Sequence, residues 1–162
     1  MVYFKNLCSK RPKNLLKQDC DKMVAIIKEQ NLEVVVMKYG SYHIDDYKKS
    51  LQKVDLVVVF EDGMIETQGL SIAEAWAENK PTFINYQINE FGGTTAPYLC
   101  TQNGLYYKNF DELQKYIHLF YGNSAFRSSF SPANFVKYNM SDEVSVENLI
   151  KICNGVNKNE TL

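Results

Sequence analysis

The sequence predicts an α/β fold, with one parallel sheet of about six strands and helices on both faces. Apolar β-branched segments alternate with segments of helical spacing along the whole chain. Some of the strand segments are continuous apolar runs, which is typical of strands covered on both faces. The 162 residues suit a single Rossmann-like domain at 1–156, followed by a loose polar tail at 157–162.

The first half of the chain alternates strands and helices. Val2–Leu7 is the first predicted strand, and a basic turn follows it. Apolar residues then recur at helical spacing over Lys13–Glu29, and Asn31 ends that helix. The run Leu32–Met37 predicts a strand buried on both faces. A further helical pattern, made by Ile44, Tyr47, Leu51 and Val54, leads into the strand Asp55–Phe60.

The second half continues the alternation. Gly69 opens a predicted helix that runs through Asn79, and Pro81 precedes the strand Thr82–Asn85. A loop rich in Gly and Thr spans roughly Tyr86–Asn103 and leads to the short strand Gly104–Tyr107. The alternation therefore extends past residue 100, and it supports crossovers that place helices on both faces of the sheet.

The C-terminal third is predicted to contain two helices. Asn109 and Glu112 form a capping box, which starts a helix that runs to about Tyr121. The segment Gly122–Met140 is expected to be irregular. Ser141 then caps a last helix, and Gly155 is expected to stop it. The apolar residues of this last helix share one face: Val146, Leu149, Ile150 and Cys153.

Composition excludes several classes of function. The net charge of −1 argues against a nucleic-acid partner. The four cysteines are scattered and lack clustered histidines, so we expect no metal site and no cofactor. No apolar run is long enough to cross a bilayer, and the N-terminus lacks the apolar core of a signal peptide. These features predict a cytoplasmic protein.

The stretch Glu66–Glu74 carries the strongest chemical signal. Ligands of parallel sheets bind at the carboxyl ends of strands, and Glu66 follows a central predicted strand. Gly69 and Leu70 place free amides at the start of the next helix, where phosphate is attracted. Two carboxylates eight positions apart flank these amides and are able to accept bonds from sugar hydroxyls. By spacing alone, solvated surface carboxylates remain the alternative.

This stretch resembles the E-x7-E motif of retaining GT-B glycosyltransferases, the large family that includes sucrose and glycogen synthases. Glu66, Gly69-Leu70, Glu74-Ala75 and Lys80-Pro81 stand in the family's order. Upstream, the run from Tyr39 to Asp55 is similar to the segment that precedes the motif. Downstream, Thr94 to Leu113 looks like the end of the same domain.

The resemblance implies a donor domain that binds a nucleoside-diphosphate sugar, and it covers nearly the whole chain. Glu74 would bind the ribose, the amides of Gly69 and Leu70 the diphosphate, and Glu66 the transferred sugar as the catalytic residue. The base would lie near three residues of the upstream run: Gly40, Ser41 and Tyr42. The acceptor-binding domain would be missing or supplied by a separate polypeptide.

The chain departs from the family after its first strand, where a Gly-Arg pair is usual. Lys5, Arg11 and Lys13 are candidate replacements that would neutralise the diphosphate. A solvated basic turn is the alternative for these three. Thr94 and Thr95, after two glycines, suit either a phosphate-binding nest or a loop that orders only with ligand or partner.

Two other functions stay open. The segment Asp55–Gly63, a helix Glu and Asn79-Lys80-Pro81 also resemble nucleoside 2-deoxyribosyltransferases, in which Glu74 would be the nucleophile. The chain lacks the Asp-x-Gly-Thr run that those enzymes carry before this Glu. The third possibility is a non-catalytic nucleotide-binding or scaffold domain with a degenerate site.

Overall fold

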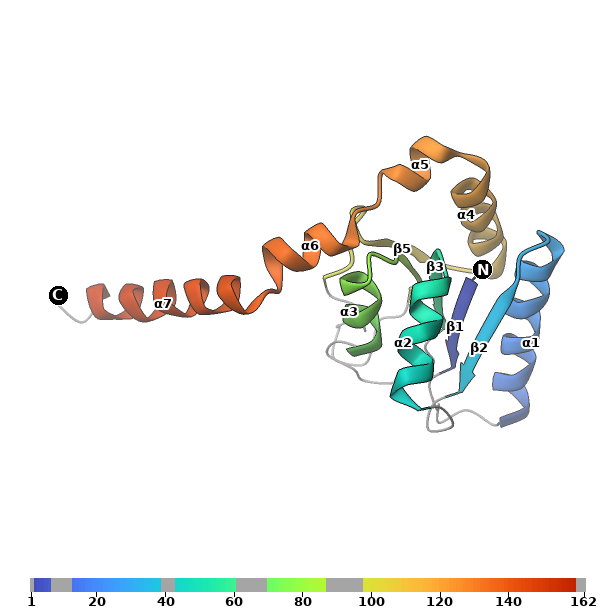
Figure 1. Ribbon diagram of the computed structural model, residues 1–162, viewed down its shortest axis with the longest axis horizontal. Coiled ribbons are helices and arrows are strands. Elements are labelled where there is room, and N and C mark those ends of the chain that lie inside the picture. Colours follow the sequence, from blue (N-terminus) through green and yellow to red (C-terminus); the bar gives the residue numbers. More distant parts are fainter. Residues whose placement is uncertain (1, 7–12, 39–42, 61–69, 87–97, 160–162) are drawn as a thin grey trace.

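The computed structural model describes residues 2–6, 13–38, 43–60, 70–86 and 98–159, and it describes side chains within 18–36, 43–60, 70–86 and 98–154. The described strands form one five-stranded sheet in the order β2-β1-β3-β4-β5 (Figure 1). All four neighbouring pairs are parallel. The strands are β1 (Val2–Asn6), β2 (Val34–Lys38), β3 (Leu56–Phe60), β4 (Thr82–Asn85) and β5 (Gly104–Tyr107).

The α/β fold with a parallel sheet is confirmed, but the sheet is smaller than predicted. It has five strands among the described residues, whereas about six were expected. The five strands coincide with the five β-rich segments of the sequence, which leaves no described segment for a sixth. The order 2-1-3-4-5 is the second common arrangement of doubly wound sheets, and ligands of such sheets also bind at the carboxyl ends of the strands.

Helices cover both faces of the sheet, as predicted. The helices α1 (Lys13–Glu29) and α4 (Phe110–Gly122) lie on one face, and α2 (Ile44–Lys53), α3 (Leu70–Ala77) and α6 (Pro132–Asn139) lie on the other (Figure 1). All five residues of the central strand β3 are buried. Its alternate residues supply both cores: Leu56, Val58 and Phe60 face α1 and α4, while Val57 and Val59 face α2 and α3.

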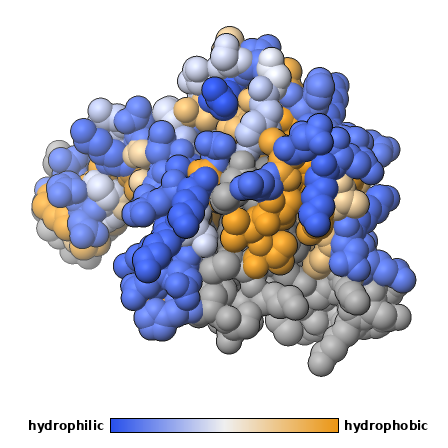
Figure 2. Space-filling model, turned by 45° about the vertical axis from the view of Figure 1, so that its right-hand side comes forward, coloured by the Kyte–Doolittle hydropathy of each residue, from blue (hydrophilic) through white to orange (hydrophobic). Residues whose placement is uncertain are grey.

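Strand β2 is not buried on both faces, contrary to the prediction from its apolar run. It lies at the edge of the sheet, where β1 is its only neighbour in the described sheet. The side chain of Val36 is 44% exposed. Figure 2, which brings the α1 side of the molecule forward, shows an apolar area bordered by hydrophilic side chains. A continuous apolar run indicates a parallel strand, but it does not tell a central strand from an edge strand.

The helix ends follow local capping chemistry. Asn31 and Asn79 have φ angles of 57° and 56°, a left-handed conformation that asparagine tolerates better than most residues after a helix. Asn31 ends α1, as predicted. The side chain of Asn109 accepts a hydrogen bond of 2.9 Å from the Glu112 amide. The Glu112 carboxylate reaches back to the amide of Lys108, one residue earlier than a capping box requires.

The segment after α4 is helical, not irregular as predicted. It contains α5 (Ser124–Ser128) and α6. Asn123 caps α5 by accepting a bond of 3.0 Å from the Phe126 amide, and Pro132 stands at the first position of α6, where its fixed φ suits a helix. Short helices with weak apolar spacing leave little periodic signal in a sequence.

The last helix, α7 (Asp142–Asn159), extends beyond Gly155, which was expected to end it. Glycine inside a helix costs about 1 kcal/mol but does not forbid helical geometry. The helix α7 projects away from the sheet and its covering helices, and α6 connects it to them (Figure 1).

Candidate functional site

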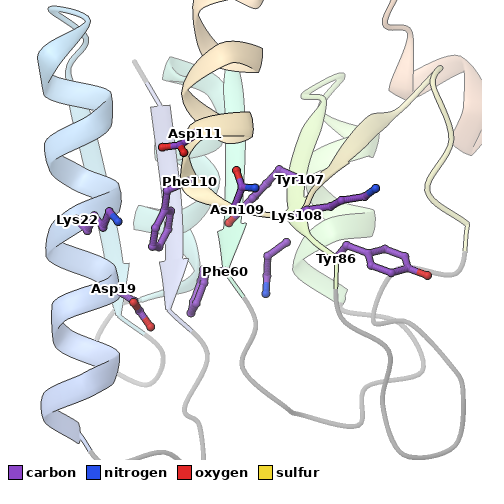
Figure 3. A pocket seen from close by; sticks show the side chains of 10 residues that line it. Asp19, Lys22, Phe60, Tyr86, Tyr107, Lys108, Asn109, Phe110 and Asp111 are labelled. Carbon is purple, nitrogen blue, oxygen red and sulfur yellow. The ribbon is translucent and has the colours of Figure 1, made fainter.

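A pocket of about 410 Å³ lies at the carboxyl ends of β3, β4 and β5, between α1 and α4 (Figure 3). This volume falls in the range of small-molecule sites, and the position is the usual one for ligands of parallel sheets. Both aromatic and polar side chains line it. The lining residues are Asp19, Lys22, Phe60, Asn85, Tyr86, Tyr107, Lys108, Asn109, Phe110 and Asp111.

The α1 side of the pocket is aromatic. The rings of Phe60, at the end of β3, and Phe110, at the start of α4, stack at 6.0 Å with an interplanar angle of 21°. The Lys22 ammonium lies 5.0 Å from the centroid of the Phe110 ring, within cation–π distance. Three elements far apart in the sequence therefore meet at one apolar surface.

Tyr107 fixes the floor of the pocket. Its hydroxyl donates a hydrogen bond of 3.0 Å to the Val59 carbonyl and lies 3.5 Å from the sulfur of Met23. Its carbonyl accepts a bond of 2.7 Å from the Tyr86 amide, which holds the end of β4 beside β5. The side chains of Tyr86 and Lys108 extend away from α1 (Figure 3), and the Tyr86 ring packs edge-on against Tyr106 at 5.4 Å.

The start of α4 is a poor anion site, although it borders the pocket. The Asn109 side chain already accepts from the Glu112 amide, and the Glu112 carboxylate accepts from the Lys108 amide. Asp111 adds an exposed carboxylate to the first turn. Carboxylates and side-chain amides beside an aromatic surface suit a neutral, hydroxyl-rich ligand better than a phosphate.

Glu74, the predicted ribose ligand, lies on the other face of the sheet from this pocket. Its side chain is exposed on α3 and lines a hollow of about 140 Å³ between α2 and α3. Tyr47 and Lys48 of α2 line the same hollow. Leu70, the first residue of α3, is 81% exposed, so the start of this helix is accessible.

Most of the other predicted site residues lie outside the described residues. These are Glu66, Gly69, Arg11, Gly40, Ser41, Tyr42, Thr94 and Thr95. For Lys5 in β1 and Lys13 at the start of α1 the structure describes the backbone alone. The chain connections still constrain them, because Glu66 and Gly69 belong to the connection from β3 to α3, and Gly40–Tyr42 to the connection from β2 to α2.

The pocket between α1 and α4 was not identified in the sequence. Its residues come from five elements and share no motif, so no local spacing brings them together. One signal did exist. The rule that ligands bind after strand ends selects Phe60 and Asn85, and it also selects Lys108 and Asn109, which follow β5. The partly buried aromatic Phe110, directly after that strand end, was the remaining clue.

The described residues hold no group of three His, Cys, Asp or Glu side chains placed to bind a metal ion. None of the described helices has the length and hydropathy needed to cross a membrane. Comparison with models of protein families and with curated proteins finds no match for this chain.

Proposed function

We propose that this chain is the donor-binding half of a GT-B-like glycosyltransferase and binds a nucleoside-diphosphate sugar across the carboxyl edge of its sheet. The supporting observation is the position of Glu74. Its exposed carboxylate shares a hollow with the first turns of α2 and lies one turn after the accessible start of α3. The arrangement agrees with a ligand that runs from the start of α2 to the start of α3.

The proposed ligand is oriented by the order of these elements. The base lies by Gly40, Ser41 and Tyr42, just before α2, and the ribose hydroxyls bond to Glu74. The diphosphate lies at the amides of Gly69 and Leu70, where the helix dipole of α3 favours negative charge. Lys5, Arg11 or Lys13, which flank the end of β1, neutralise the leaving diphosphate.

The sugar end of the donor extends past the end of β3 toward the pocket between α1 and α4. Glu66, in the connection that follows β3, contacts this sugar and stabilises the charge that it gains in the transition state. The aromatic pair Phe60 and Phe110, with the carboxylates of Asp19 and Asp111, offers the apolar and hydrogen-bonding surfaces that a sugar ring uses. An acceptor-binding domain, supplied by a second polypeptide, completes the cleft.

The hollow at Glu74 favours this reading over a nucleoside 2-deoxyribosyltransferase. A covalent nucleophile needs a pocket that encloses the nucleoside, and about 140 Å³ is below the usual range for a ligand of that size. A ribose hydroxyl ligand has no such requirement, because the rest of the nucleotide lies along the surface.

Calorimetry with the purified chain tests the proposal. Nucleoside diphosphates, their sugar conjugates and free nucleosides are titrated separately, and each ligand is also added in a thermal-shift series. We expect nucleoside diphosphates to bind and their sugar conjugates to bind more tightly. Binding of nucleosides alone would support the deoxyribosyltransferase function, and no binding of any of the three would support a scaffold domain.

A further inference from the structure

The helix α7 carries an apolar stripe that no described part of the chain covers. Val146, Leu149 and Ile150 are 54%, 60% and 53% exposed, and Cys153 is exposed as well. These positions recur at intervals of three, four and seven, so they share one side of the helix. The helix stands clear of the sheet, as Figure 1 shows, and this side is free to receive a partner.

We propose that the partner is α7 of a second copy, packed antiparallel to form a two-fold symmetric dimer. The first support is the symmetry of the stripe itself. An axis between Leu149 and Ile150 places Leu149 against Ile150 of the other copy, and Val146 against Cys153. Every apolar residue of the stripe then meets an apolar residue, as a two-fold interface requires.

The charges beside the stripe fit the same axis. Glu147 and Lys151 lie on one flank, the carboxylate before the ammonium. In an antiparallel pair each flank faces the same flank of the other helix, running in the opposite direction. The axis that pairs Leu149 with Ile150 therefore brings Glu147 opposite Lys151, twice by symmetry. This charge complementarity determines the direction of pairing.

A parallel pair lacks this match. In that arrangement the flank with Glu147 and Lys151 faces the opposite flank, which carries the uncharged Ser145 and Ile152. A membrane surface is also a poor fit, because helices that lie on membranes carry a basic polar face. Within its described side chains α7 has Asp142, Glu143 and Glu147 but only one cation, Lys151.

The interface is small, so the dimer is reversible. Four apolar side chains from each copy bury less surface than the roughly 1,200 Å² of stable protein interfaces. The dimer thus forms as concentration rises, and its α/β bodies stay apart at opposite ends of the helix pair. The proposal does not depend on the glycosyltransferase function.

Sedimentation equilibrium across a wide protein range tests the association. We expect the mass to rise from the 18.7 kDa of the monomer toward twice that value. Leu149→Asp should weaken association about 10-fold or more, since it places a charge at the axis. Asn148→Asp, on the side of α7 away from the stripe, is the matched control and should not change it. A monomer at every concentration, or equal effects of both variants, would overturn the dimer.

Two further variants test the direction. Glu147→Lys should weaken association, and adding Lys151→Glu should restore it, because both cross-pairs are then reversed. Val146→Cys should form a disulfide with Cys153 of the other copy under mild oxidation, mapped by mass spectrometry. The same two positions in one helix are roughly 10 Å apart, too far to bridge. Crosslinks of Cys153 to Cys153, or binding to anionic vesicles without self-association, would contradict the antiparallel dimer.

Discussion

The Tyr47 hydroxyl donates a hydrogen bond of 3.1 Å to the carbonyl of Ser71, and both residues are buried. This bond joins the first turn of α2 to the first turn of α3, the two helix starts at which we place the nucleotide. Tyr47→Phe should therefore lower the free energy of unfolding by about 1 kcal/mol. Urea denaturation measures this. Tyr138→Phe, at a tyrosine that is 65% exposed, is the control and should cause no loss.

Glu112→Gln should reduce the dependence of stability on pH. The Lys108 amide and the Tyr116 hydroxyl donate to the Glu112 carboxylate, and these bonds hold its pKa below the ordinary value, the Lys108 bond most strongly. The unfolded chain therefore binds the proton more readily. The carboxylate stabilises the fold above the ordinary glutamate pKa, and this stabilisation is lost as the pH falls through the lower folded value.

Thermal melts of both proteins at neutral pH and at pH values below about 4 check this. The wild type should lose more of its melting temperature on acidification than the variant does. Glu143, whose pKa is also lowered, titrates in both proteins, so the difference between them isolates Glu112. Equal losses in the two proteins would mean that the carboxylate contributes nothing in solution.

The sequence predicted the layers of the fold well because β-branched runs and helical spacing are local signals. It failed at features set by position in the sheet. The run Leu32–Met37 looks the same whether its strand is central or at an edge, and only the sheet order leaves Val36 exposed. Similarly, Gly155 is a common helix stop, yet the structure extends α7 past it.

The candidate site divides in the same way. Glu74 was identified because it belongs to a short motif on one helix. The pocket of Phe60, Asn85 and Phe110 was not, because three strand ends and two helices assemble it and each residue is ordinary in its local context. Sequence spacing carries information about one element at a time, whereas a pocket of this kind depends on how the elements are arranged.

Glu74→Ala should weaken the binding of nucleoside diphosphates. The change removes the acceptor that we assign to the ribose hydroxyls, and a charged hydrogen bond contributes on the order of 1.5–3 kcal/mol. The expected loss in affinity is thus about 10-fold or more, measured by calorimetry. Glu29→Ala, at an exposed glutamate near the end of α1, should bind like the wild type. Unchanged affinity in Glu74→Ala would refute the assignment.

Asp111→Ala should separate the sugar end of the donor from its nucleotide end. The pocket that Asp111 lines is proposed to hold the sugar, so the variant should lose most of the extra affinity that a nucleoside-diphosphate sugar has over the bare diphosphate. Affinity for the diphosphate itself should stay the same. Asp142→Ala removes a similar exposed carboxylate from the first turn of α7 and is the control. If both ligands weaken equally, the pocket does not bind the sugar.

Glu66→Gln keeps the shape of the side chain and removes its charge, which separates chemistry from affinity at the residue that we assign to catalysis. The sugar gains positive charge as the diphosphate leaves, and a nearby carboxylate stabilises that charge in the transition state. With the acceptor-binding partner supplied, we expect turnover to fall about 10²-fold or more while the bare nucleoside diphosphate binds normally. Discrimination among donor sugars should weaken too. If Glu66 is a solvated loop residue, turnover and sugar preference will match the wild type, and that outcome would remove Glu66 from the site.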